Sequence, residues 1–184
     1  MSLPTLAAAL LGLTLLGSQC ALAAPPLPRQ SPEFSIKAPD GETTQLSGFK
    51  GKVVVLEFLF VRSQHCIRVA QTLNQLQGEM GARGLQAVGV AFDAPNAAVT
   101  GGEYLSAMTA ALNLTYPVGY AEKQSVDTYL GRTGNELLSI PQMVIIDRTG
   151  TIRAVTGSQT NPALENPDAL RTLLASLLAE PAKH

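Results

Sequence analysis

The chain has 184 residues, a formal net charge of −1 and 46% hydrophobic residues. This length accommodates one domain with a hydrophobic core behind a short leader. The near-neutral charge, without a Lys/Arg cluster, argues against a nucleic-acid partner. Two histidines, one of them C-terminal, are too few for a metal cluster, so we expect no metal and no other cofactor.

The N-terminal segment is typical of a secretory signal. Residues 1–28 contain a long apolar run, no charged side chain, and an Ala-Leu-Ala sequence that ends at Ala23. We therefore expect residues 1–23 to be a signal peptide that directs export to a bacterial periplasm or an extracytoplasmic membrane face. Two alternatives remain, a retained membrane anchor and lipidation of Cys20. Cleavage would leave Cys66 as the only cysteine and exclude an internal disulfide.

The next segments predict a linker and a hairpin. Residues 24–33 are rich in proline and predict a short extended linker. We expect the folded domain to span residues 34–181. It opens with two short strand patterns, residues 34–37 and 43–46, whose intervening Asp-Gly pair is typical of a tight β-hairpin turn.

A buried strand that leads directly into a helix follows the hairpin. Residues 52–61 form a nearly continuous apolar run, typical of a strand buried on both faces. Ser63 is a good N-cap and would put Cys66 at the third helical position. The apolar residues of the helix recur at helical spacing: Val69, Leu73, Leu76 and Met80. Free backbone N–H groups and the helix dipole favour a thiolate in this first turn. The alternative is that Cys66 is only a small buried hydrophobe.

The remaining chain alternates between strand and helix patterns. A capping box formed by Thr100 and Glu103 predicts a helix start. In chain order we expect strands or helices over residues 85–92 (strand), 104–112 (helix), 116–119 (strand), 126–130 (helix), 142–146 and 151–155 (strands) and 170–178 (helix). Strands separated by helices imply parallel pairs, and the tight turn between the last two strands implies an antiparallel pair.

In this order the sequence resembles the thioredoxin-like superfamily, specifically the redoxin group of TlpA-like reductases and AhpC/TSA peroxiredoxins. The resemblance implies an α/β thioredoxin-like fold, a central mixed sheet flanked by helices, with an added N-terminal β-hairpin. Ser63-Gln64-His65-Cys66 stands in place of the family's C-x-x-C, so Cys66 matches the second cysteine. Pro141 matches the cis-proline beside the active-site sulfur. Glu57 matches a buried acid that the family uses as a proton relay.

The replacement of the first cysteine by Ser63 changes the expected chemistry. A hydroxyl does not exchange with disulfides at neutral pH, so the resemblance no longer implies a dithiol cycle. The pattern S-x-x-C is itself similar to the peroxiredoxin motif, although the proline expected shortly before it is missing here. The candidate catalytic residues are Cys66, Ser63, Glu57, Pro141 and His65. For His65 the alternative is a solvent-facing side chain, and for Glu57 an exposed edge position.

The leading hypothesis is an exported thiol oxidoreductase that acts through Cys66 in disulfide exchange or peroxide reduction, with an antioxidant role in cell redox homeostasis. Its partners would be a protein thiol or disulfide, or a peroxide, together with an external thiol reductant. One alternative is a non-catalytic thioredoxin-fold module that holds extended peptides at Pro141. The other is a one-cysteine peroxidase whose sulfenic acid is reduced by an external thiol.

Overall fold

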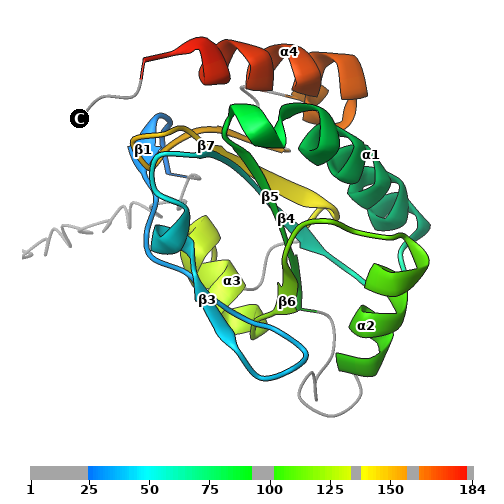
Figure 1. The fold of residues 1–184 in the computed structure, drawn as a ribbon. Coiled ribbons are helices and arrows are strands. Elements are labelled where there is room, and N and C mark those ends of the chain that lie inside the picture. The colour runs from blue at the N-terminus through cyan, green and yellow to red at the C-terminus, as the bar shows by residue number, and fades with distance from the viewer. Residues whose placement is uncertain (1–24, 93–101, 134–137, 157–161, 182–184) are drawn as a thin grey trace, which may run out of the picture.

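The computed structural model describes residues 25–92, 102–133, 138–156 and 162–181 (Figure 1). Within these residues one mixed sheet of eight strands forms the centre of the molecule. In spatial order its strands are β1 (Arg29–Gln30), β8 (Thr151–Val155), β7 (Gln142–Ile146), β4 (Val53–Leu59), β5 (Leu85–Ala91), β6 (Val118–Tyr120), β2 (Ser35–Lys37) and β3 (Thr43–Gln45). The helices are α1 (Gln64–Met80), α2 (Gly102–Ala111), α3 (Lys123–Leu130) and α4 (Pro167–Ala179), with short 3-10 segments η1 (Leu46–Phe49), η2 (Gly81–Arg83) and η4 (Pro162–Glu165).

The strand pairing confirms the predicted α/β class and the thioredoxin-like arrangement. Strands β4, β5 and β6 are parallel, because helices connect them, whereas β7 is antiparallel to β4 and β8 to β7. The predicted hairpin is present as β2 and β3, and it joins the sheet at β6 through the pair Lys37 and Tyr120. The Asp-Gly turn between its strands has Gly41 at φ 92°, a conformation that glycine adopts without a Cβ clash.

The structure corrects the expected linker and one strand boundary. Arg29 and Gln30 lie in the segment expected to be a linker, but they form β1 and pair with β8. Strand β4 ends at Leu59 instead of Val61, because the chain turns there to enter α1. The expected cap at Thr100 and the expected signal, residues 1–23, lie outside the described residues. None of the described helices is both long and apolar enough to cross a membrane.

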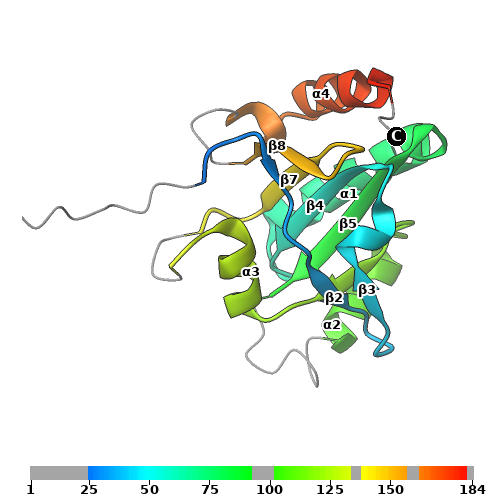
Figure 2. The same ribbon diagram turned by 90° about the vertical axis from the view of Figure 1, so that its left-hand side faces the viewer.

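The two faces of the sheet have separate hydrophobic cores. Helices α1, α2 and α4 cover one face and α3 covers the other, as Figures 1 and 2 show. Successive side chains of a strand point to opposite faces. In β4, Val53, Val55 and Leu59 accordingly belong to the core under α1, and the apolar residues between them to the other core. This alternation puts Glu57 on the α1 face, the same side as Cys66.

Candidate thiol site

The site is built where β4 turns into α1. Ser63 has extended backbone angles and its Oγ accepts a hydrogen bond from the N–H of Cys66 at 3.3 Å. This bond confirms Ser63 as the N-cap and Cys66 as the third helical residue, as the sequence predicted. The cap could be predicted because its signals are local. The apolar run of β4 ends just before Ser63, and the apolar repeat of the helix follows it.

The Cys66 sulfur is both buried and hydrogen-bonded. The residue is 1% exposed, and the backbone N–H of Phe60 donates to its Sγ at 3.4 Å. An N–H donor and the positive end of a helix dipole stabilise a thiolate, whereas burial disfavours it. The amide of Phe60 could not be found from the sequence, because its direction depends on how the chain turns after β4.

Glu57 lies on the face of the sheet that α1 covers, and its carboxyl group is buried. The residue is 0% exposed, and neither carboxyl oxygen has a hydrogen-bond partner in the described structure. Burial raises the pKa of Glu57 to about 8, so the carboxyl group is mostly protonated at neutral pH. These facts exclude the alternative of an exposed edge position. Because Glu57 lies on the face where Cys66 packs, a titratable group shares the core of the thiol.

Tyr116 completes this buried polar group and was missed by sequence reasoning. Its hydroxyl donates to the carbonyl of Ala70 in α1 at 3.3 Å. Its pKa is raised first by burial and second by the charge of Glu57, so the two groups act on each other electrostatically. No local pattern could have revealed this pair, because several elements of the fold separate Tyr116 from Glu57 in the sequence.

His65 is tied to a distant element instead of lying alone. Its Nε2 is 3.2 Å from a carboxylate oxygen of Glu165 in η4, and both side chains are partly exposed. The bridge joins the first turn of α1 to the segment that precedes α4. A protonated His65 would add positive charge near Cys66, but Glu165 neutralises much of it. Sequence reasoning missed Glu165, which lies far along the chain.

Pro141 lies at the same end of the sheet as the thiol. The Ile140–Pro141 peptide bond is cis, as the resemblance implied, and Pro141 is buried. Register pairs Phe58 with Gln142, so Pro141 comes next to the end of β4 from which the chain turns into α1. The structure therefore places Cys66, Ser63 and Pro141 at the same end of the central strands β4 and β7. Glu57 lies one residue pair further inside the sheet.

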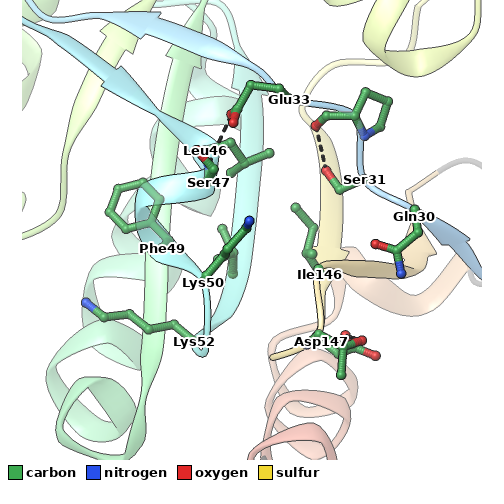
Figure 3. A pocket seen from close by; sticks show the side chains of 14 residues that line it. Gln30, Ser31, Glu33, Leu46, Ser47, Phe49, Lys50, Lys52, Ile146 and Asp147 are labelled. Atoms are coloured by element: carbon green, nitrogen blue, oxygen red, sulfur yellow. Dashed lines mark hydrogen bonds between the residues drawn. The ribbon is translucent and has the colours of Figure 1, made fainter. Parts of the chain in front are cut away.

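A pocket of about 280 Å³ lies elsewhere (Figure 3). It is bounded by η1, the start of β4 and the end of β7, and its lining includes Glu33, Lys50, Ile146 and Asp147. Because β4 runs from this pocket to the turn before α1, the pocket and Cys66 lie at opposite ends of the strand. It is therefore separate from the thiol site. Among the described residues, no group of three His, Cys, Asp or Glu could hold a metal ion.

Comparison with known proteins identifies the family. The model of the AhpC/TSA family matches residues 28–155. The chain belongs to the AhpC/TSA family. The thioredoxin-like protein YneN of Bacillus subtilis (strain 168) is 28% identical over 138 residues, which cover 74% of this chain and 75% of the relative.

Solved structures agree on the fold. A thiol:disulfide interchange protein of the thioredoxin family from Chlorobium tepidum TLS has a TM-score of 0.68 at 20% identity, covering 85% of this chain and 100% of its own. A secreted disulfide oxidoreductase of Mycobacterium tuberculosis, homologous to E. coli DsbE, has a TM-score of 0.60 at 19% identity, covering 78% of this chain and 96% of its own. The AhpC/TSA protein described here thus has the thioredoxin-like fold that thiol–disulfide oxidoreductases use.

Proposed function

We propose that the protein is an exported thiol oxidoreductase in which Cys66 reduces a small peroxide and an external thiol restores it. The observation that carries this proposal is the state of Cys66 Sγ. The sulfur accepts the N–H of Phe60 at 3.4 Å in the first turn of α1, while its residue is only 1% exposed. The amide donor and the helix start favour a thiolate at this sulfur, and its burial favours a small oxidant over a large one.

Burial favours a peroxide over a protein disulfide as the oxidant. Disulfide exchange requires a thiolate to approach one sulfur of the substrate in line with the bond that breaks. In a C-x-x-C site the exposed first cysteine makes that attack, and here this position is the hydroxyl of Ser63. A polypeptide disulfide cannot reach the sulfur of Cys66 without opening the site. A peroxide presents only two oxygen atoms.

The proposed cycle needs one kind of external reductant, a thiol, and consumes two thiol molecules for each peroxide. The Cys66 thiolate attacks one oxygen of the peroxide, the O–O bond breaks, and the sulfur becomes a sulfenic acid while the other oxygen leaves with a proton as an alcohol or water. Glu57, protonated at neutral pH, holds a proton on the same face of the sheet. An external thiol then displaces water to form a mixed disulfide. A second thiol releases Cys66 and a low-molecular-weight disulfide.

Family membership and the signal peptide predicted for residues 1–23 support export as part of the proposal. AhpC/TSA membership is consistent with peroxide reduction, and one structural neighbour is described as secreted. Export through residues 1–23 would remove Cys20 and leave Cys66 without a second cysteine in the chain. An external thiol is therefore part of the proposed cycle.

The same burial favours a second candidate, a peptide-binding module without catalysis. In this alternative Cys66 is an inert core residue, and the edge around the cis-proline Pro141 holds an extended chain. The two candidates differ in one property, because only the first requires the sulfur to react.

The deciding experiment exposes the full-length reduced protein to hydrogen peroxide and follows Cys66 by mass spectrometry and by peroxide consumption with dithiothreitol. We expect a mass increase of one oxygen on Cys66, turnover with the external thiol, and a second-order rate above that of free cysteine. Cys20→Ser is the matched control and should leave the rate unchanged, whereas Cys66→Ser should abolish it. A rate no higher than that of free cysteine would reject peroxide reduction and leave the peptide-binding module as the remaining candidate.

A further inference from the structure

A fixed guanidinium lies beside the thiol site. Arg62 is the residue immediately before the N-cap Ser63, and its guanidinium carbon lies 4.3 Å from the centre of the Tyr104 ring in α2. Figure 1 shows α2 next to the end of α1 at which Cys66 lies. The stacked pair therefore lies at the same end of α1 as Cys66 and not at the distant pocket.

The donors of Arg62 are unused within the described part of the chain. No carboxylate or carbonyl there accepts a hydrogen bond from its side chain. Stacking occupies the flat face of a guanidinium and leaves the N–H groups at its edge free, in the fork geometry that matches a carboxylate. Tyr104 is itself 49% exposed, unusually high for a large apolar side chain in this fold. Together they form a charged edge and an apolar face that are both open to solvent.

We propose that Arg62, held by Tyr104, is the specificity residue that recognises the carboxylate of an anionic low-molecular-weight thiol, the reductant of oxidised Cys66. The inference rests on the proposed function. A chain with Cys66 as its working thiol must accept its electrons from outside, and hydrogen peroxide offers no charged group to recognise. The thiol is the larger co-substrate, so we expect Arg62 to select among thiols by their charge.

The neighbouring charges are consistent with this assignment. His65, in the first turn of α1, is already paired with Glu165. Arg68 is exposed on the same helix, and within the described residues its side chain has neither an acidic partner nor an aromatic ring stacked on it. Arg68 shares the charge and the exposure of Arg62 but lacks the stacked ring. It therefore offers a matched control for non-specific electrostatic attraction.

The first test measures recognition without any redox step. Iodoacetate and iodoacetamide alkylate thiols by the same reaction and differ in one carboxylate. In the full-length protein carrying Cys20→Ser, we expect Arg62→Gln to lower the iodoacetate-to-iodoacetamide rate ratio about fivefold, the upper end of the range for one exposed charge pair. Arg68→Gln should change it less than about twofold by the same reasoning. Tyr104→Ala should fall between them, and added salt should remove the difference.

The second test follows the proposed reductant. The peroxide-oxidised protein is mixed with mercaptoacetate or with its neutral amide, and the recovery of free thiol is timed. Arg62→Gln should slow recovery with mercaptoacetate and leave recovery with the amide unchanged. Equal slowing with both thiols, or the same loss in Arg68→Gln, would overturn the assignment. So would selectivity in alkylation without selectivity in thiol reduction.

The tests separate this inference from the proposed function. Failure of peroxide to oxidise Cys66 would reject peroxide reduction, and the alkylation ratio would still decide whether Arg62 recognises a carboxylate at this site. An intact ratio in Arg62→Gln would reject the specificity role alone. No reaction with either alkylating agent would reject both, because the sulfur would then be inaccessible.

Discussion

Replacing Glu57 by Gln should abolish a pH dependence of stability that the buried carboxyl group creates. Glu57 has a pKa of about 8 in the folded chain against an ordinary value of 4.5, and burial is the cause. Between these two values the folded chain holds a proton that the unfolded chain has released. The stability that the protonated Glu57 contributes is therefore fully present below pH 4.5 and is lost progressively as pH rises to about 8.

The magnitude follows from linkage. One proton gives a slope of about 1.4 kcal/mol per pH unit, so between pH 4.5 and pH 7 the wild type should lose about 3 kcal/mol of stability relative to Glu57→Gln. A buried amide without a partner costs about 1–3 kcal/mol in its own right, but that cost does not depend on pH. The slope, and not the absolute stability of Glu57→Gln, is therefore the informative quantity.

The assay is urea unfolding of the wild type and Glu57→Gln at several pH values across this window. Subtracting the two curves cancels the titration of the histidines and of the exposed carboxylates. Glu42→Gln, an exposed substitution in the hairpin, is the matched control and should retain the wild-type slope. Parallel curves for wild type and Glu57→Gln would refute the reasoning, because they would mean that Glu57 ionises in the fold as it does in water.

Further predictions concern the thiol and the leader. The pH midpoint for Cys66 alkylation should lie below about 8.5, the value of a free cysteine, because of the Phe60 amide and the helix start; a midpoint at or above it leaves an inert thiol. In Glu57→Gln that profile should become a single titration, and superimposable profiles would show that Glu57 does not sense the thiol. Ser63→Cys should form a disulfide with Cys66 and gain insulin-reductase or thiol-oxidase activity; a disulfide without that gain would make the likeness to a reductase superficial. In a bacterium the chain should lose residues 1–23, and mass spectrometry of an intact or diacylated N-terminus would instead indicate an anchor or a lipoprotein.

The predictable part of the site was the part that local rules determine. An apolar run, a polar cap and a helical repeat follow one another in a single short stretch, so β4, α1 and the Ser63 cap could be assigned from the amino-acid sequence alone. The position of Cys66 in the helix followed from that cap. The parallel and antiparallel pairs at the centre of the sheet followed from the alternation of strands and helices. The pairing of Arg29 with β8 did not, because a two-residue edge strand leaves no hydrophobic pattern.

The contacts that tune the site could not be predicted, because each joins elements that are distant in the sequence. Glu165 in η4 pairs with His65. Burial, and then the charge of Glu57, raises the pKa of Tyr116, which lies in the loop before β6. Neither partner has a sequence signal, since a lone Glu and a lone Tyr are ordinary in such segments. Only the packing of α1 against the sheet and against η4 brings Glu165 to His65, and Tyr116 to the core that holds Glu57.

Glu57 also bears on the choice between the two candidate functions. A peptide-binding module needs a suitable surface around Pro141, and a side chain that is 0% exposed cannot touch a ligand there. For such a module an apolar residue at this position would pack at least as well, without the cost of burying a carboxyl group that has no hydrogen-bond partner among the described residues. A thiol that exchanges protons during each cycle, by contrast, has a use for a group that titrates near neutral pH on its own side of the sheet. The buried acid thus favours chemistry at Cys66 over an inert thiol.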